Sequence, residues 1–209
     1  MIHPDTAIKF VSEQIGLGVF ATADIPKGTL IYVRDPLEQK LAPRDFNALD
    51  TAQKAAVEKY SYVDAQGNLI VSWDHAKYMN HSCECNTIGT AYGFEIALRD
   101  IKAGEELTTE YGVLNIQLEY AIGCGCRQCR GMLRACDIDH YHMLWDGWIV
   151  DALKEVPRLR QPLWPVMDAG IRGEVEAYLA GSGDYRPILT RKWRPSGKAQ
   201  VHSFEFTFK

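Results

Sequence analysis

Two stretches rich in thiols and polar side chains stand out in the sequence. The first runs from Asn80 to Asn86 and holds two amides, an imidazole, a hydroxyl and two thiols in seven residues. The second holds Cys124, Cys126 and Cys129 within six residues. Such a density of donors, acceptors and soft ligands is typical of a site where backbone and side chains together hold a ligand.

The spacing of the three later thiols allows one turn to aim them at a single metal ion. Tetrahedral zinc needs a fourth ligand, for which we rank Cys83 first, Cys85 second and Cys136 third. Four protein ligands leave no position for water, so the zinc would be structural. A rival set of mixed type is better interpreted as a helix start capped by its first or second aspartate; its members are Cys136, Asp137, Asp139, His140 and His142.

Between the two thiol stretches, a tyrosine stands between an acid and a glycine. Tyr111 could simply end a strand, but a phenol at this place can also orient an attacking amine or carry a proton. Near the start of the chain, Gly16 and Gly18 let the backbone turn tightly and approach a ligand. A hairpin turn is the simpler explanation, and a lone Gly-x-Gly pair favours it. A dinucleotide fingerprint is excluded because no third glycine follows at the required spacing.

Short strands and a few helices must position these residues. Alternating or β-branched runs predict strands at 8–11, 29–33, 69–72, 94–98 and 204–208. Apolar residues at helical spacing predict helices at about 44–59, 141–156 and 164–180. We therefore expect an α+β fold, mainly β in its first half and helical towards its end. The stripe with Trp145 and Trp148 must be buried, either within the chain or in a homodimer formed through this helical extension.

The composition is that of a folded protein, with 46% hydrophobic and 24% charged residues. A formal net charge of -4 gives no reason to expect direct binding to nucleic acid. No apolar run reaches the roughly 20 residues of a membrane span, and the first residues lack the features of a signal peptide. We expect an intracellular protein, cytoplasmic or, in a eukaryote, nuclear, with its six cysteines as thiols or metal ligands.

Together and in this order, four motifs resemble the SET-domain protein lysine methyltransferases that carry a cysteine-rich post-SET segment. The resemblance covers about residues 6 to 131 and implies a SET domain at 6–115, with a helical insert at 44–60, and a post-SET zinc segment at 116–131. It leaves 132–209 as a mainly helical extension. The motifs are Gly16-x-Gly18-x-Phe20-Ala21, Asn80-His81-Ser82-Cys83-x-x-Asn86, the stretch from Gly104 to Tyr111-Gly112, and Cys124-x-Cys126-x-x-Cys129.

The resemblance implies a SET-type fold of small curved sheets, in which the Cys124 region threads near the Asn80 loop in a pseudoknot. Tyr111 matches the catalytic tyrosine of the family, and Cys83 matches the thiol that completes the zinc site. The cofactor, S-adenosylmethionine, would lie against residues from three places in the chain: Gly16, Leu17, Gly18, Lys77, Asn80, His81 and Tyr111.

Three positions depart from the family pattern. Cys85 stands where proline is frequent, and Lys77 stands where an arginine usually meets the cofactor carboxylate. Thr109 replaces the usual Phe or Tyr, so the smaller side chain leaves room for more methyl groups or indicates another substrate. Tyr60 and Tyr62 are candidates for a second hydroxyl that orients the substrate amine.

The implied function is transfer of methyl groups from S-adenosylmethionine to a lysine side chain of a protein or peptide partner. Two alternatives remain open. The first is a catalytically silent SET scaffold that only binds cofactor or peptide. The second is a methyltransferase that acts on a free amino acid or small amine.

Overall fold

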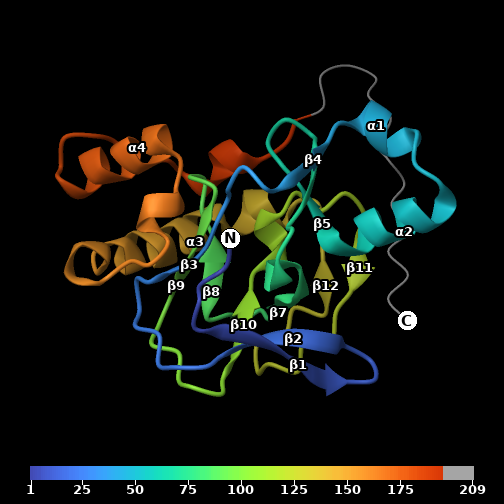
Figure 1. The fold of residues 1–209 in the computed structure, drawn as a ribbon, viewed down its shortest axis with the longest axis horizontal. Helices are drawn as coiled ribbons and strands as arrows, with labels where there is room; N and C mark the ends of the chain where they lie inside the picture. The colour runs from blue at the N-terminus through green and yellow to red at the C-terminus, as the bar shows by residue number, and fades with distance from the viewer. Residues whose placement is uncertain (195–209) are drawn as a thin grey trace.

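Four small β-sheets and a helical C-terminal part make up the computed structural model, which describes residues 1–194 (Figure 1). The predicted α+β class, with several small sheets followed by helices, is confirmed. The strand predicted at 204–208 lies outside the described residues. None of the helices in the described part of the chain combines the length and the apolar character that crossing a bilayer requires.

The first sheet brings the glycine turn and the polar stretch together. Its order is β1-β2-β10-β7, formed by β1 (Thr6–Ser12), β2 (Gly16–Ala21), β10 (Glu106–Thr109) and β7 (Asn80–His81). β1 and β2 form a hairpin with Gly16 at a φ of 84°, a left-handed conformation that glycine adopts freely. β7 runs parallel to β10, with Asn80 opposite Thr108 and His81 opposite Thr109. The polar stretch therefore lies beside the residues that lead into Tyr111.

The second sheet carries the C-terminal helices. It has the order β3-β9-β8, with β3 (Leu30–Val33), β9 (Phe94–Ala97) and β8 (Thr87–Gly89), and α3 (Asp137–Leu153) and α4 (Ala169–Leu179) lie on the same side of the molecule as this sheet (Figure 1). One apolar cluster joins sheet and helices, including Leu30, Ile96, Trp145 and Ile149. Trp145 is 1% exposed and Trp148 packs against the same cluster, so this part of the predicted stripe is buried within the chain, whereas Leu144 is 51% exposed. The homodimer stays a prediction.

The third sheet flanks the predicted insert at 44–60. β4 (Gln39–Leu41), β6 (Leu69–Val71) and β5 (Ser61–Val63) form the order β4-β6-β5. The single helix predicted at about 44–59 is wrong, because the chain forms α1 (Pro43–Asn47) and α2 (Thr51–Tyr60) instead. Asp50 starts α2 with a capping box: its carboxylate accepts from the Gln53 backbone at 2.8 Å, and the Gln53 side chain accepts from the Asp50 backbone at 3.0 Å.

Both C-terminal helices differ from their predicted bounds. The helix predicted at 141–156 ends at Leu153, and Pro157 lies in the 3-10 helix η3 (Val156–Arg158). The helix predicted at 164–180 is split into η4 (Trp164–Val166) and α4, because the Asp168 carboxylate accepts hydrogen bonds from the Gly170 and Ile171 N–H groups and starts a new helix.

The predicted cap of α3 is wrong as well. Cys136 occupies the N-cap position without a side-chain hydrogen bond, and Asp137 is the first helical residue. The Asp137 carboxylate instead accepts from the Arg134 N–H at 3.2 Å and lies 3.4 Å from the Arg130 guanidinium. The Asp137 carboxylate, which the local sequence predicts as a helix cap, is thus engaged in an ion pair with Arg130.

Shorter elements complete the described chain. η1 (His75–Tyr78) precedes β7, η2 (Tyr111–Val113) follows β10, and η5 (Ile188–Arg191) lies near the end of the described residues. β11 (Tyr120–Ala121) pairs with β12 (Met132–Leu133) and closes the loop that carries the three later thiols.

Candidate active site

Tyr111 is held by the polar stretch at two points. Its phenol donates a hydrogen bond to the Met79 carbonyl oxygen at 2.7 Å, and its backbone N–H donates to Nδ1 of His81 at 3.2 Å. Burial raises the pKa of Tyr111, and the nearby carboxylates of Glu95 and Glu106 raise it further. The phenol is therefore protonated at neutral pH and does not serve as a base.

The glycine turn packs directly against Asn80. The side-chain amide of Asn80 donates to the Leu17 carbonyl at 3.1 Å and to the Glu106 carboxylate at 2.7 Å. A Cβ added at Gly18 would lie 2.8 Å from Cγ2 of Val11 and 3.0 Å from Nδ2 of Asn80, so no side chain fits there. The residues predicted to hold the cofactor at Gly16–Gly18 and at Asn80 thus lie together in the structure.

A narrow cavity lies beside Tyr111. It has a volume of about 140 Å³, below the roughly 300–1,000 Å³ of ordinary small-molecule sites. The space suits one extended side chain better than a whole small molecule. Five residues singled out in the sequence line this cavity, namely Tyr60, Tyr62, Lys77, Thr109 and Tyr111.

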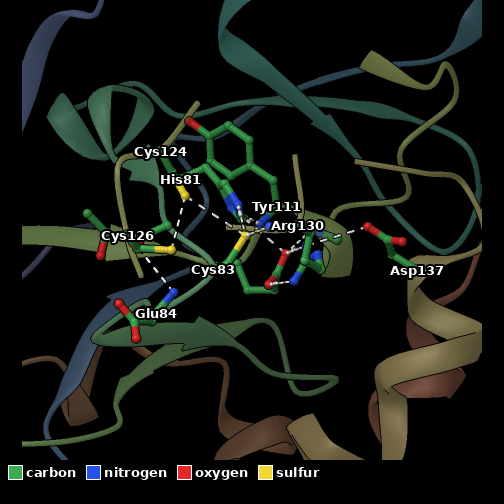
Figure 2. Close-up of polar contacts among 12 residues, drawn as sticks. His81, Cys83, Glu84, Tyr111, Cys124, Cys126, Arg130 and Asp137 are labelled. Carbon is green, nitrogen blue, oxygen red and sulfur yellow. Dashed lines mark hydrogen bonds and ion pairs between the residues drawn. The ribbon is translucent and has the colours of Figure 1, made fainter. Parts of the chain in front are cut away.

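Three thiols converge next to His81, as Figure 2 shows. The sulfur of Cys124 lies 3.3 Å from that of Cys126 and 3.9 Å from that of Cys83. The backbone of Gly131 lowers the pKa of Cys129, and the nearby Cys124 and Cys83 lower it further. Burial raises the pKa of Cys83 to about 12. Such a set of soft donors around one point is typical of zinc sites.

Cys85 and His81 differ in their position relative to the thiol cluster. Cys85 is buried, and its pKa is raised by burial and then by the Glu110 and Glu95 carboxylates. Its hydrogen-bond and ion-pair neighbours in the described chain include none of the three later thiols. Nε2 of His81 lies 3.3 Å from the Cys83 sulfur. His81, Cys83 and Cys124 are close enough to one another to share a metal ion. The sequence linked His81 to the cofactor, whereas its ring faces the thiols.

The rival metal set does not converge. Asp137 pairs with Arg130, Asp139 pairs with Lys192, and His142 lies 4.0 Å from Asp146 one turn along the helix. The interpretation of these residues as the beginning of a helix is confirmed.

Arg130 is a residue that the sequence analysis missed. Its guanidinium binds both carboxylate oxygens of Glu110, at 2.6 and 2.7 Å, and lies over the ring of Tyr141 at 5.0 Å from the centroid. Its backbone N–H lies 3.4 Å from the Cys83 sulfur. A fork of this kind is the strong form of a carboxylate contact. No sequence motif identifies Arg130, because only the folded structure brings its carboxylate partners, Glu110 and Asp137, next to it.

Asn115 joins three distant parts of the chain and was also missed. Its amide donates to the carbonyls of Val63 and Arg191, each at 3.0 Å, and its carbonyl accepts from the Trp193 N–H at 2.8 Å. Its φ is 56°, a conformation that asparagine tolerates better than most residues. The Arg191 guanidinium then lies 5.2 Å from the centroid of the Tyr62 ring. The helical extension therefore contributes to the wall of the cavity.

Comparison with known proteins finds a matching family model and similar sequences. Residues 16–112 match the SET domain family model. The chain is 28% identical over 102 residues to the histone-lysine N-methyltransferase SET5 of Yarrowia lipolytica, which covers 42% of this chain and 22% of that protein. It is 32% identical over 120 residues to the histone-lysine N-methyltransferase, H3 lysine-36 specific, of Schizosaccharomyces pombe, covering 50% of this chain and 14% of that protein.

Among solved structures, the chain is similar to the methyltransferase domain of human histone-lysine N-methyltransferase SETMAR. The TM-score is 0.44 with 19% sequence identity, over 64% of this chain and 58% of that one. The chain spans less than a quarter of the length of the two curated relatives above.

Proposed function

Residues 16–112 of this chain form a SET domain, and from that premise we propose that the protein is an S-adenosylmethionine-dependent methyltransferase acting on lysine. Its acceptor would be the side-chain amine of a lysine in a protein or peptide. The observation that carries this proposal is the cavity of about 140 Å³ beside the Tyr111 phenol, whose size suits one side chain.

The residues around the cavity favour a reactive amine. A free lysine has a pKa of about 10.4 and is charged at neutral pH, but transfer from water into the cavity disfavours the ammonium form. The phenol proton of Tyr111 is directed to Met79, so the lone pairs of its oxygen are free to accept a hydrogen bond from the amine. Orientation of the amine then supplies much of the rate.

The residues that would hold S-adenosylmethionine fit its charged end. When bound, this cofactor supplies the methyl group as a sulfonium. Lys77 lines the cavity and forms no ion pair among the described residues, so its ammonium is available to a carboxylate. Gly16, Leu17 and Gly18 would lie against the cofactor, together with Asn80, His81 and Tyr111. The close packing of Gly18 on Asn80 supports one continuous binding face.

The thiol cluster would hold one structural zinc ion. The ligands would be Cys83, Cys124, Cys126 and Cys129, and the short distances from the Cys124 sulfur to the sulfurs of Cys83 and Cys126 support the first three. With four thiolate ligands the ion has no position for water. It would hold the loop closed by β11 and β12 against the stretch next to Tyr111.

The degree of methylation should follow from Thr109. Its side chain is small and lines the cavity, which leaves space beside the amine for methyl groups already added. We expect di- or trimethylated product, detectable by mass spectrometry. A strictly monomethylated product would contradict this reasoning.

The test of the proposed function is transfer of tritium from labelled S-adenosylmethionine to a pool of lysine-containing proteins. Tyr111→Phe should abolish transfer but keep affinity for S-adenosylhomocysteine, measured by calorimetry. Tyr178→Phe, on α4 and outside the residues that line the cavity, is the matched control and should keep activity. Cofactor binding without transfer would instead support the silent scaffold, and strong competition by free lysine would support a small-amine acceptor.

A further inference from the structure

A carboxylate lies in the wall of the cavity. Glu95 belongs to β9, and its neighbours Phe94, Ile96 and Ala97 are all buried and apolar. Glu95 lines the same cavity as Thr109 and Tyr111. A charged residue in an otherwise apolar strand is a signal in the sequence, but the sequence alone does not show where the carboxylate points.

The carboxylate has little compensation within the protein. The Thr87 hydroxyl lies 3.2 Å from one of its oxygens, but the same hydroxyl lies 3.1 Å from the Thr108 carbonyl. A hydroxyl has one proton to donate, so it serves one of the two at a time. Within residues 1–194, Glu95 forms no ion pair: Arg191, whose charge lowers the pKa of Glu95, donates its hydrogen bond to the Thr90 carbonyl at 3.1 Å instead.

A second polar group in the cavity lacks a partner. Thr109 is 2% exposed, and its hydroxyl makes no hydrogen bond of normal geometry, although it lies close enough to Glu95 to lower the pKa of that carboxyl. Buried polar groups are nearly always hydrogen-bonded, and an unpaired one requires an explanation. A ligand that is both cationic and a hydrogen-bond donor would satisfy the hydroxyl and the carboxylate together.

We propose that Glu95 and Thr109 form a binding site for an alkylammonium group in the wall of the cavity. The cavity admits an aliphatic chain, which would pack beside the rings of Tyr60 and Tyr62. Lys59 and Arg191 already lie over these two rings, so the attraction for the cation comes from Glu95. The nature of the physiological ligand, a lysine side chain or its methylated form, rests on the proposed function. The binding site itself does not.

The same pair would prepare the amine. Burial raises the pKa of Glu95, so its carboxylate accepts a proton more readily than an exposed carboxylate does. One N–H bond of the ammonium breaks, its electron pair stays on nitrogen, and an O–H bond forms on Glu95. The neutral amine then stands beside the Tyr111 phenol, and Glu95 later releases the proton to water.

The test compares two probes of equal length without any methyl donor. n-Butylammonium chloride mimics the lysine side chain, and n-butanol is its uncharged analogue; both are titrated into the full chain by NMR. The wild type should bind the cation at least about tenfold more tightly than the alcohol, since a hydrogen bond to a charged group is worth one to two powers of ten in affinity. Equal binding of the two probes, or no binding of the cation, would overturn the proposal.

Variants separate the site from general effects of charge. Glu95→Gln should lose the preference for the cation by about tenfold or more and keep the affinity for n-butanol. Glu38→Gln is the matched control, because it removes another carboxylate, 3% exposed, that does not line the cavity, and it should bind both probes as the wild type does.

A third variant keeps the test decisive if Glu95→Gln does not fold. Thr109→Val replaces a hydroxyl by a methyl group of similar size and should weaken binding of the cation at least about threefold, whereas unchanged binding would count against the proposal. These measurements do not depend on methyl transfer. A wild type that binds the cation selectively but transfers no label would refute the proposed function and leave this inference standing.

Discussion

Arg130→Met tests the ion pair that joins the thiol-bearing loop to the residue before Tyr111. Methionine keeps much of the length of the arginine and removes its charge. The change leaves two carboxylates, Glu110 at 0% and Asp137 at 2% side-chain exposure, without their cation. Removing one partner of a buried ion pair lowers stability by about 3–5 kcal/mol. In a chain of this size each kcal/mol corresponds to roughly 2–4 °C, so the melting temperature should fall by roughly 6–20 °C.

Arg127→Met supplies the control for this prediction. Arg127 lies in the same loop but is exposed, so its replacement should change stability by no more than about 0.5 kcal/mol. Both variants are measured by calorimetry and by urea unfolding at equal zinc concentration. If Arg130→Met loses no more stability than Arg127→Met, the fork to Glu110 contributes little and the argument from buried charge is wrong.

Three further predictions concern the glycines, the thiols and Glu95. Gly112→Ala would place a Cβ 2.7 Å from the ring of the fully buried Trp145 and should lower stability by about 1–3 kcal/mol, whereas Gly147→Ala in α3 meets no atom within 4 Å and should raise it by about 0.5–1 kcal/mol, as urea unfolding would show. Cys83→Ser should lose bound zinc and Cys85→Ser should retain it, measured by native mass spectrometry; loss in both variants, or in Cys85→Ser alone, would contradict the ligand set. The pKa of Glu95 is raised above its ordinary value of 4.5, so its ionisation destabilises the fold as pH rises. Glu95→Gln should therefore melt at a higher temperature than the wild type at neutral pH and at the same temperature below about pH 4, where Glu95 is protonated in both states.

Local patterns in the sequence predicted most elements, because they depend on neighbours along the chain. The strand predicted at 69–72 and the turn at Gly16 both follow from β-branched residues and glycine chemistry. The break between α1 and α2 was readable too, since Asp50 followed three residues later by Gln53 is a capping box. The apolar spacing alone concealed it, because the periodicity continues across the break.

Contacts across the fold lay beyond sequence reasoning. Arg130 follows the last cysteine of its motif, yet its partners come from η2 and α3. A binding role for the Glu95 carboxylate can be inferred only from the cavity, which residues of the insert and of η5 line together with it. The resemblance to a family drew attention to Tyr111 and the thiols, but it is silent about the residues of the helical extension.

The hydrogen bonds that join Asn115 to Val63, Arg191 and Trp193 have a consequence for folding during translation. Val63 is synthesised well before Asn115, whereas Arg191 and Trp193 are synthesised more than 70 residues later. During translation the cavity wall cannot close until this late segment has left the ribosome. Until then the nascent chain lacks Arg191, one of the residues that line the cavity with Glu95 and Thr109. Contacts of such long range also slow folding, so this wall of the cavity should form late, when η5 comes into place.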